Sequence, residues 1–140
     1  DVRSGNDAIR RAAVDAFRAG LAGIAARRNV GLHVETLYDE PAAQCDAALQ
    51  KQFESAIAAQ GIAPRYLASG AGHDAMVFPA VAPMAMLFVR CGNNGISHHP
   101  DETMTEEDAE VATQVLLHFF EHYQPPEFKT DRAQRVERPI

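Results

Sequence analysis

Apolar residues recur every three or four positions in three stretches of the chain, which is the period of an amphipathic helix. These stretches cover residues 6–28, 43–60 and 105–123. Their apolar positions are Ile9, Ala13, Phe17, Leu21 and Ile24, then Cys45, Leu49, Phe53 and Ile57, and finally Ala112, Val115, Leu116 and Phe119. We therefore predict three helices, each with one face suited to packing against another element.

Residues at the ends of these stretches support the same three helices. Ser4, Asn6 and Asp7 are candidates to cap the start of the first helix, since their side-chain oxygens can accept bonds from free backbone amides. Gly61 follows the second stretch, where glycine readily adopts the left-handed conformation that ends a helix. Thr105, with Asp108 three residues on, resembles a capping box and predicts the start of the third helix.

The remaining apolar patterns predict strands. Residues 30–36 alternate apolar and polar positions, residues 65–68 suggest a short strand, and residues 84–89 form a continuous apolar run typical of a buried strand. A short helix is expected from His73 to Phe78. The order of helices and strands predicts an α/β fold, with a boundary between two pieces near Glu40 and Pro41.

Composition narrows the classes of partner. The chain has 140 residues, a net charge of −6 and no extended basic patch, which argues against nucleic-acid binding. No apolar run approaches the roughly 20 residues that cross a membrane. Cys45 and Cys91 lie far apart without a Cys-x-x-Cys motif, so we expect two free thiols in a reducing cytoplasm. The chain opens at Asp1 without an initiator methionine, and we expect a piece of a longer protein.

Most of the candidate functional residues lie in two glycine-containing polar segments. Residues 69–75 read SGAGHDA and residues 95–102 read GISHHPDE, so each combines histidine with carboxylates. Imidazole beside carboxylate is a common pairing at metal sites. The first segment also satisfies the loose pattern GxGxxA of dinucleotide-binding loops. That alternative is disfavoured, because residues 91–94 stand where an acidic residue would be expected and no complete βαβ unit surrounds the loop.

With these two motifs together, residues 1–124 resemble the C-terminal half of the hydantoinase/carbamoylase-type M20 amidohydrolases, which include N-carbamoyl-L-amino-acid hydrolases and allantoate amidohydrolases. The resemblance implies an α/β fold: a partial three-layer, zinc-peptidase-like catalytic domain over residues 41–124. Before it, residues 1–40 would form the second half of an α+β lid, or dimerisation, domain. Residues 125–140 would be a tail. The run at residues 90–94 departs from the Pro-Ser-Arg-Gly-type run of many relatives.

The resemblance also implies roles for individual residues. His98, in the GISH motif, would bind one of two catalytic metal ions, zinc or manganese. His73 would face the substrate beside the Gly72 backbone and donate a hydrogen bond to the developing oxyanion. Arg3, in an Asp-x-Arg motif, would hold the substrate carboxylate. His99 stays unassigned.

Each candidate has a simpler structural interpretation. Taken singly, Arg3 would be a surface residue and His98 a loop residue that caps a turn. Asp74 could fix the tautomer of His73 or merely cap a short helix. His118 and His122, four apart on a predicted helix, could hold a metal ion in principle, but no HExxH motif is present and a solvated helix face is the better interpretation.

The function implied by the resemblance is hydrolysis of an amide or ureido C–N bond in a small carboxylate-bearing substrate, such as an N-carbamoyl amino acid or allantoate. The other metal ligands and the catalytic glutamate of the family come from an N-terminal portion without a counterpart in this chain. Because zinc sites normally use at least three protein ligands, His98 cannot build the centre, and we expect the chain to be inactive alone. The alternative is a truncated, non-catalytic dimerisation or interaction module. On either view we expect a homo-oligomer.

Overall fold

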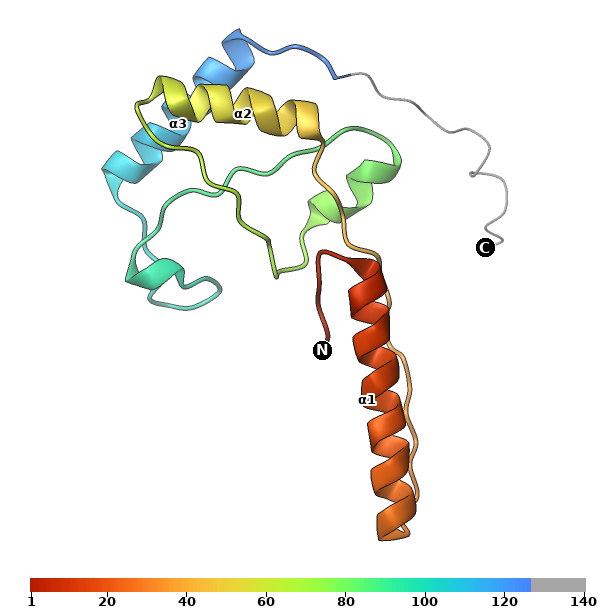
Figure 1. The fold of residues 1–140 in the computed structure, drawn as a ribbon. Coiled ribbons are helices and arrows are strands. Elements are labelled where there is room, and N and C mark those ends of the chain that lie inside the picture. The colour runs from red at the N-terminus through yellow and green to blue at the C-terminus, as the bar shows by residue number, and fades with distance from the viewer. Residues whose placement is uncertain (127–140) are drawn as a thin grey trace. The chain divides into compact units, whose positions relative to one another are not determined.

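The computed structural model describes residues 1–126 of the chain, and these contain three α-helices and two short 3₁₀ helices. The α-helices are α1 (Asp7–Arg28), α2 (Ala47–Ala59) and α3 (Glu106–Glu121), and the 3₁₀ helices are η1 (Asp74–Ala80) and η2 (Asn93–Gly95) (Figure 1). The chain divides into two compact units. The first comprises Asp1–Gln44 and Leu67–Val77, and the second Cys45–Tyr66 and the chain from Phe78 onward.

The three predicted α-helices are confirmed, and polar side chains start each of them. Asn6 accepts hydrogen bonds from the amides of Ala8 and Ile9 at 3.0 and 3.2 Å, so it is the N-cap among the three candidates. Asp46 caps α2 in the same way. Thr105 Oγ1 accepts from the Asp108 amide at 3.1 Å and donates to the Asp108 carboxylate at 2.9 Å. These bonds satisfy amides that have no partner within the helix.

Residues in the left-handed conformation follow the ends of two helices. Asn29 ends α1 in this conformation with φ 52°. Gly61 has φ +73°, and its amide donates to the Ala58 carbonyl at 2.9 Å, which closes the last turn of α2 as expected. Asparagine and glycine both tolerate this conformation, which is why each can follow the end of a helix.

The predicted strands are wrong for this part of the chain, because residues 1–126 contain helices but no β-strand. Residues 30–36, 65–68 and 84–89 run extended without a strand ladder, so the α/β layering is not confirmed. The physical reason is that a strand is completed by hydrogen bonds to a neighbouring strand, whereas the alternating pattern describes only its faces. The predicted burial of residues 84–89 is met only in part, since residues 84–87 are half-buried whereas Phe88 and Val89 are exposed.

The second unit contains the buried core of the described residues. Leu49 and Ala56 of α2 pack with Val115 and Phe119 of α3, and Ala85 and Leu87 cover the cluster in part. The rings of Phe53 and Phe119 stack with centroids 4.1 Å apart and planes at 2°. A pair of hydrogen bonds also joins Gln52 to the backbone of Gln124 at 2.7 and 2.9 Å.

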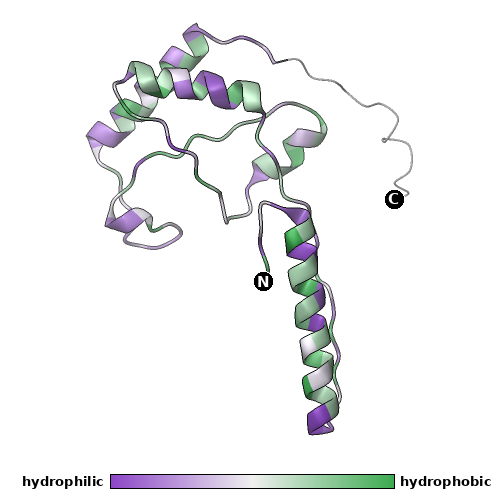
Figure 2. Cartoon of the chain, viewed as in Figure 1, coloured by the Kyte–Doolittle hydropathy of each residue, from purple (hydrophilic) through white to green (hydrophobic). Residues whose placement is uncertain are grey.

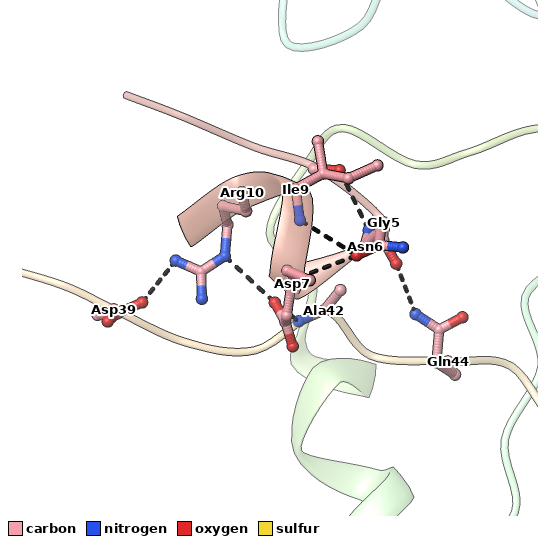
Figure 3. Close-up of polar contacts among 10 residues, drawn as sticks. Gly5, Asn6, Asp7, Ile9, Arg10, Asp39, Ala42 and Gln44 are labelled. Carbon is pink, nitrogen blue, oxygen red and sulfur yellow. Dashed lines mark hydrogen bonds and ion pairs between the residues drawn. The ribbon is translucent and has the colours of Figure 1, made fainter. Parts of the chain in front are cut away.

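In the first unit, the extended chain after α1 runs back along the helix (Figure 1). Polar contacts hold the two together. The guanidinium of Arg18 donates to Thr36, and that of Arg10 bridges Asp7 at 3.2 Å and Asp39 at 2.5 Å. Figure 3 shows the bridge at the start of α1, where Asp7 also accepts from the Ala42 amide at 3.1 Å. This network fixes the return segment against the first turn of the helix.

No residue of α1 is buried, although apolar side chains occur along its whole length (Figure 2). Ile9 is 63% exposed, Phe17 61% and Ile24 43%. Val30, Leu32 and Val34 of the return segment are exposed as well. The apolar face that the sequence predicts is therefore present and largely exposed within the first unit, with Leu21 half-buried.

Candidate functional site

The first glycine-rich loop and Arg3 come together in the first unit. The Nη1 of Arg3 donates a hydrogen bond to the carbonyl oxygen of Gly70, 67 residues further along the chain. The other edge of the guanidinium holds the carboxylate of Asp1, whose Oδ2 accepts from Nε at 2.8 Å and from Nη2 at 2.5 Å. Arg3 is exposed, and its Nε–Nη2 edge already binds a carboxylate. A planar guanidinium suits such two-pronged binding of a carboxylate, and the role of Arg3 toward a substrate stays a prediction.

His73 lies just before η1 and has a defined hydrogen bond at one ring nitrogen. Its Nδ1 accepts from the backbone amide of Ala75 at 3.0 Å, and its carbonyl accepts from the Met76 amide at 2.9 Å. In a neutral imidazole, an accepting Nδ1 leaves the proton on Nε2. His73 is exposed, so Nε2–H is a hydrogen-bond donor available to a ligand.

The bond that orients His73 comes from Ala75, which the sequence reasoning missed. Fixing the His73 tautomer was one of two alternatives for Asp74, and a backbone amide two residues on makes the described contact with Nδ1. The available signal was local: a histidine at the start of a short helix can accept from the amide of the second following residue, as aspartate and asparagine do in turns. Asp74 is the first residue of η1 and lies in its first turn.

Gly72 has room for a side chain in this structure. A Cβ placed there would meet only the Met76 sulfur at 3.9 Å, an ordinary contact, and the backbone is not in the left-handed region. Packing within the described residues therefore does not require glycine at this position. Glycine at position 72 would instead allow a ligand to approach the backbone closely.

The second loop lies in the second unit and is closed at its base. The Gly92 amide donates to the Thr103 carbonyl at 2.7 Å, and Asn93 Nδ2 donates to the Asp101 carbonyl at 2.5 Å. Here glycine is required, because a Cβ on Gly92 would lie 2.5 Å from Thr103 Oγ1. The departure from the family pattern at residues 90–94 thus coincides with a compact, internally bonded loop base.

His98 lies at the tip of this loop in the left-handed conformation, with φ 56°. Its backbone amide donates to the Glu102 carboxylate at 2.8 Å, a contact that the sequence reasoning did not single out. The neighbouring His99 has Nδ1 3.6 Å from an Asp101 carboxylate oxygen and accepts from the Asp101 amide at 3.2 Å. A non-glycine residue at positive φ is uncommon and costs free energy, and such residues concentrate at functional sites.

A metal centre is not complete within these residues. The described part of the chain contains no group of three or more histidine, cysteine, aspartate or glutamate side chains that could hold a metal ion. His98 is one candidate ligand, in the second unit, whereas Arg3 and His73 belong to the first. The residues present therefore do not fit a bound catalytic metal by themselves.

Two carboxylates have pKa values below their usual range because of their surroundings. The Ala42 amide that donates to Asp7 lowers the pKa of this carboxyl, with a further contribution from Arg10. The Arg90 guanidinium lowers the pKa of Asp108, assisted by the Thr105 hydroxyl. Both carboxylates lie in the first turns of helices and not in the histidine-containing loops. Their lowered pKa values therefore reflect the contacts of these helix starts and not the chemistry of the candidate site.

Cys45 and Cys91 are free, half-buried thiols, and Cys45 Sγ lies 3.8 Å from the sulfur of Met84. No helix among residues 1–126 is long and apolar enough to cross a membrane.

The chain is similar to one protein family and to several proteins of known activity. The sequence profile described as peptidase family M20/M25/M40 matches residues 6–122. The chain is 38% identical to the N-carbamoyl-L-amino acid amidohydrolase of Geobacillus stearothermophilus over 68% of its residues, and 34% identical to allantoate deiminase 2 of Glycine max over 87%. It is 33% identical to the allantoate deiminase of Arabidopsis thaliana over 86%. No solved structure matches.

The matches extend over 23%, 27% and 24% of these three relatives, so the chain spans about a quarter of their length. Membership of the family fits a zinc-peptidase-like fold and implies dependence on a divalent metal. With a profile match over residues 6–122 of 140, the chain belongs to peptidase family M20/M25/M40.

Proposed function

We propose that this chain supplies the carboxylate-binding and oxyanion-binding groups of a metal-dependent amidohydrolase. Its substrate would be a small molecule with a carboxylate and a ureido or amide group, such as an N-carbamoyl amino acid or allantoate. The proposal is supported above all by the contact of Arg3 with Gly70, since it joins the predicted carboxylate-binding residue to the loop of His73 within one unit. The printed names of the relatives support the same substrate class.

In this proposal Arg3 binds the substrate carboxylate through Nε and Nη2, the edge that holds Asp1. A planar guanidinium suits this task because it offers two parallel donors. His73 donates from Nε2 to the substrate carbonyl oxygen as water adds to the carbon and negative charge develops on that oxygen. The Ala75 amide keeps the proton on Nε2. The backbone at Gly72 leaves space for the substrate.

We propose His98 as one ligand of the family's divalent metal, for which we favour two zinc or manganese ions. When bound, such ions activate water and polarise the carbonyl group. Residues 1–126 do not supply the further ligands that a complete centre requires. We also propose that residues 1–40 act as part of a lid and residues 41–124 as part of a catalytic domain, working in the cytoplasm.

A chimera tests this function. The matched part of this chain would replace the corresponding segment of the allantoate deiminase 2 of Glycine max, since this match extends over 87% of the chain. Ammonia release from N-carbamoyl amino acids and allantoate would be measured with Mn²⁺ or Zn²⁺. We expect turnover by the chimera and none by the 140-residue chain alone. The proposal is wrong if the chimera folds, as judged by circular dichroism, but hydrolyses neither substrate class while the parent enzyme is active.

Variants of the chimera assign the roles. Arg3→Lys should raise KM about tenfold because it removes the two-pronged grip on the carboxylate. His73→Asn should lower kcat by about 100-fold, the usual cost of losing an oxyanion donor. Gly72→Ala should raise KM without lowering stability, since the position has room for a methyl group. Arg18→Lys, which changes an arginine bonded to Thr36 elsewhere in the same unit, is the matched control.

We further propose that the chain self-associates through α1, in agreement with the alternative of a dimerisation module. The uncovered apolar face of α1 supports this, because large exposed apolar patches favour association. Light scattering should give at least twice the monomer mass. Phe17→Lys with Ile24→Lys should yield monomers, whereas Asp15→Lys, with the same change of charge, should not. A monomeric parent chain would refute the proposal.

A further inference from the structure

Two histidines on the last turn of α3 form a closely spaced pair. His118 and His122 lie four residues apart, so their side chains project from the same face of the helix. Their rings stack with centroids 4.1 Å apart and planes at 19°. They belong to the second unit, and neither residue lies in the glycine-rich loops. The pair therefore stands apart from the proposed function and needs its own explanation.

One hydrogen bond sets the tautomer of His122. Its Nδ1 lies 2.9 Å from the backbone carbonyl oxygen of His118. A carbonyl oxygen can only accept, so Nδ1 is the donor and, in the neutral ring, Nε2 retains its lone pair. Metal-bound histidines commonly donate their other ring N–H to a backbone carbonyl in this way, which fixes the tautomer and the ring orientation.

The position of the pair on the helix also favours a cation. His118 lies in the last turn of α3 and His122 is its C-cap residue. Carbonyl groups without intrahelical partners give this end of a helix a partial negative charge. His118 is half-buried and His122 is exposed, so an ion from solvent can reach the rings. Ring centroids 4.1 Å apart place both imidazoles within reach of one ion.

We propose that His118 and His122 form a two-histidine clamp for a borderline divalent transition metal, namely Cu²⁺, Ni²⁺ or Zn²⁺. Imidazole nitrogen suits these ions, whereas Mg²⁺ and Ca²⁺ prefer oxygen. Two protein ligands leave the remaining coordination positions to water. The absence of any three-residue ligand group among residues 1–126 agrees with such an open site. Affinity should follow the order Cu²⁺ above Ni²⁺ and Zn²⁺.

The test measures binding of Ni²⁺ to the 140-residue chain by titration calorimetry. The informative variant is Leu117→His with His118→Leu, which keeps the composition but places the histidines five positions apart. At about 100° per residue, the two rings then point in directions about 140° apart. We expect the affinity of the tightest site to fall about tenfold or more. His122→Gln, which leaves a single histidine on this turn, should have the same effect.

A control separates this clamp from other histidines of the chain. His33→Gln, at a histidine without a proposed role, should leave the tightest site unchanged. Far-UV circular dichroism should show equal helix content in all variants. Bound Cu²⁺ should show two nitrogen ligands in the electron paramagnetic resonance spectrum of the parent chain, and one in the shifted variant. The inference is overturned if the parent chain binds no Ni²⁺ at millimolar concentration. It is also overturned if the shifted variant, Leu117→His with His118→Leu, or the variant His122→Gln binds Ni²⁺ as tightly as the parent chain.

Discussion

Helix α1 and the pair formed by α2 and α3 have similar sequence patterns, but only α2 and α3 bury apolar residues. All three helices have apolar residues at helical spacing and a polar side chain that caps the first turn. Two of them meet, so that Leu49, Ala56, Val115 and Phe119 become buried. In α1 no residue is buried, and Phe17 remains 61% exposed. The difference lies in the partner surface and not in the helix itself.

The comparison shows what amphipathic periodicity does and does not predict. A helix with good caps can form wherever its backbone amides are satisfied, and this information is local. Burial requires a second apolar surface at the right distance, which comes from residues far away in the sequence. The α2–α3 contact joins Phe53 to Phe119, 66 positions apart, whereas the segment facing α1 contributes mainly polar bonds such as Arg10 to Asp39.

The largest predicted effect tests the burial contrast directly. Phe119→Ala should lower the free energy of unfolding by about 3 kcal/mol, because it empties the core and removes a stacked ring. Phe17→Ala, the same change on the exposed helix, should alter it by less than about 0.5 kcal/mol at protein concentrations too low for self-association. Urea unfolding followed by circular dichroism measures both. Equal losses would show that α1 is packed in solution and would break the comparison.

A smaller effect is expected from the helix caps, which the two regions share. Asn6→Ala and Asp46→Ala each remove an oxygen that accepts from two amides. Each should cost about 1 kcal/mol of helix stability, and replacement by serine should cost much less. Hydrogen exchange at the first amides of each helix is the measurement. We expect the loss on α1 to appear as fraying of its first turn, since packing does not hold that turn. On α2 it should lower global stability.

The smallest effect concerns acid. The pKa values of Asp7 and Asp108 are lowered in the folded chain, chiefly by the Ala42 amide and by Arg90 respectively. A depressed folded pKa contributes stability above the ordinary value of 3.8, and this contribution is lost as the pH falls through the folded pKa. Stability should therefore decline below about pH 4, and Asp7→Asn or Asp108→Asn should each flatten the decline. An unchanged acid profile in both variants would contradict the assignment.

Much of the candidate site could be named from the sequence, because its residues lie in two short motifs and beside one terminus. Arg3, Gly72, His73 and His98 were all singled out there, and their roles stay proposals. The contacts that orient them could not be named in advance. The Ala75 amide on His73, the Glu102 carboxylate under the His98 amide and the Gly70 carbonyl on Arg3 depend on how each loop turns. Backbone groups have no distinguishing residue type, so a motif does not reveal them.

By itself the sequence determined the family, the three helices and the capping role of Thr105, since each depends on residues close together along the chain. Only the tertiary structure decided which apolar faces became buried and whether extended segments became strands. It buried one side of α2 and α3, left α1 uncovered, and formed no ladder from residues 30–36, 65–68 or 84–89 within the described chain. The physical reason is that periodicity describes one face of a single element. Burial and strand pairing each require contact with a second element, which periodicity does not specify.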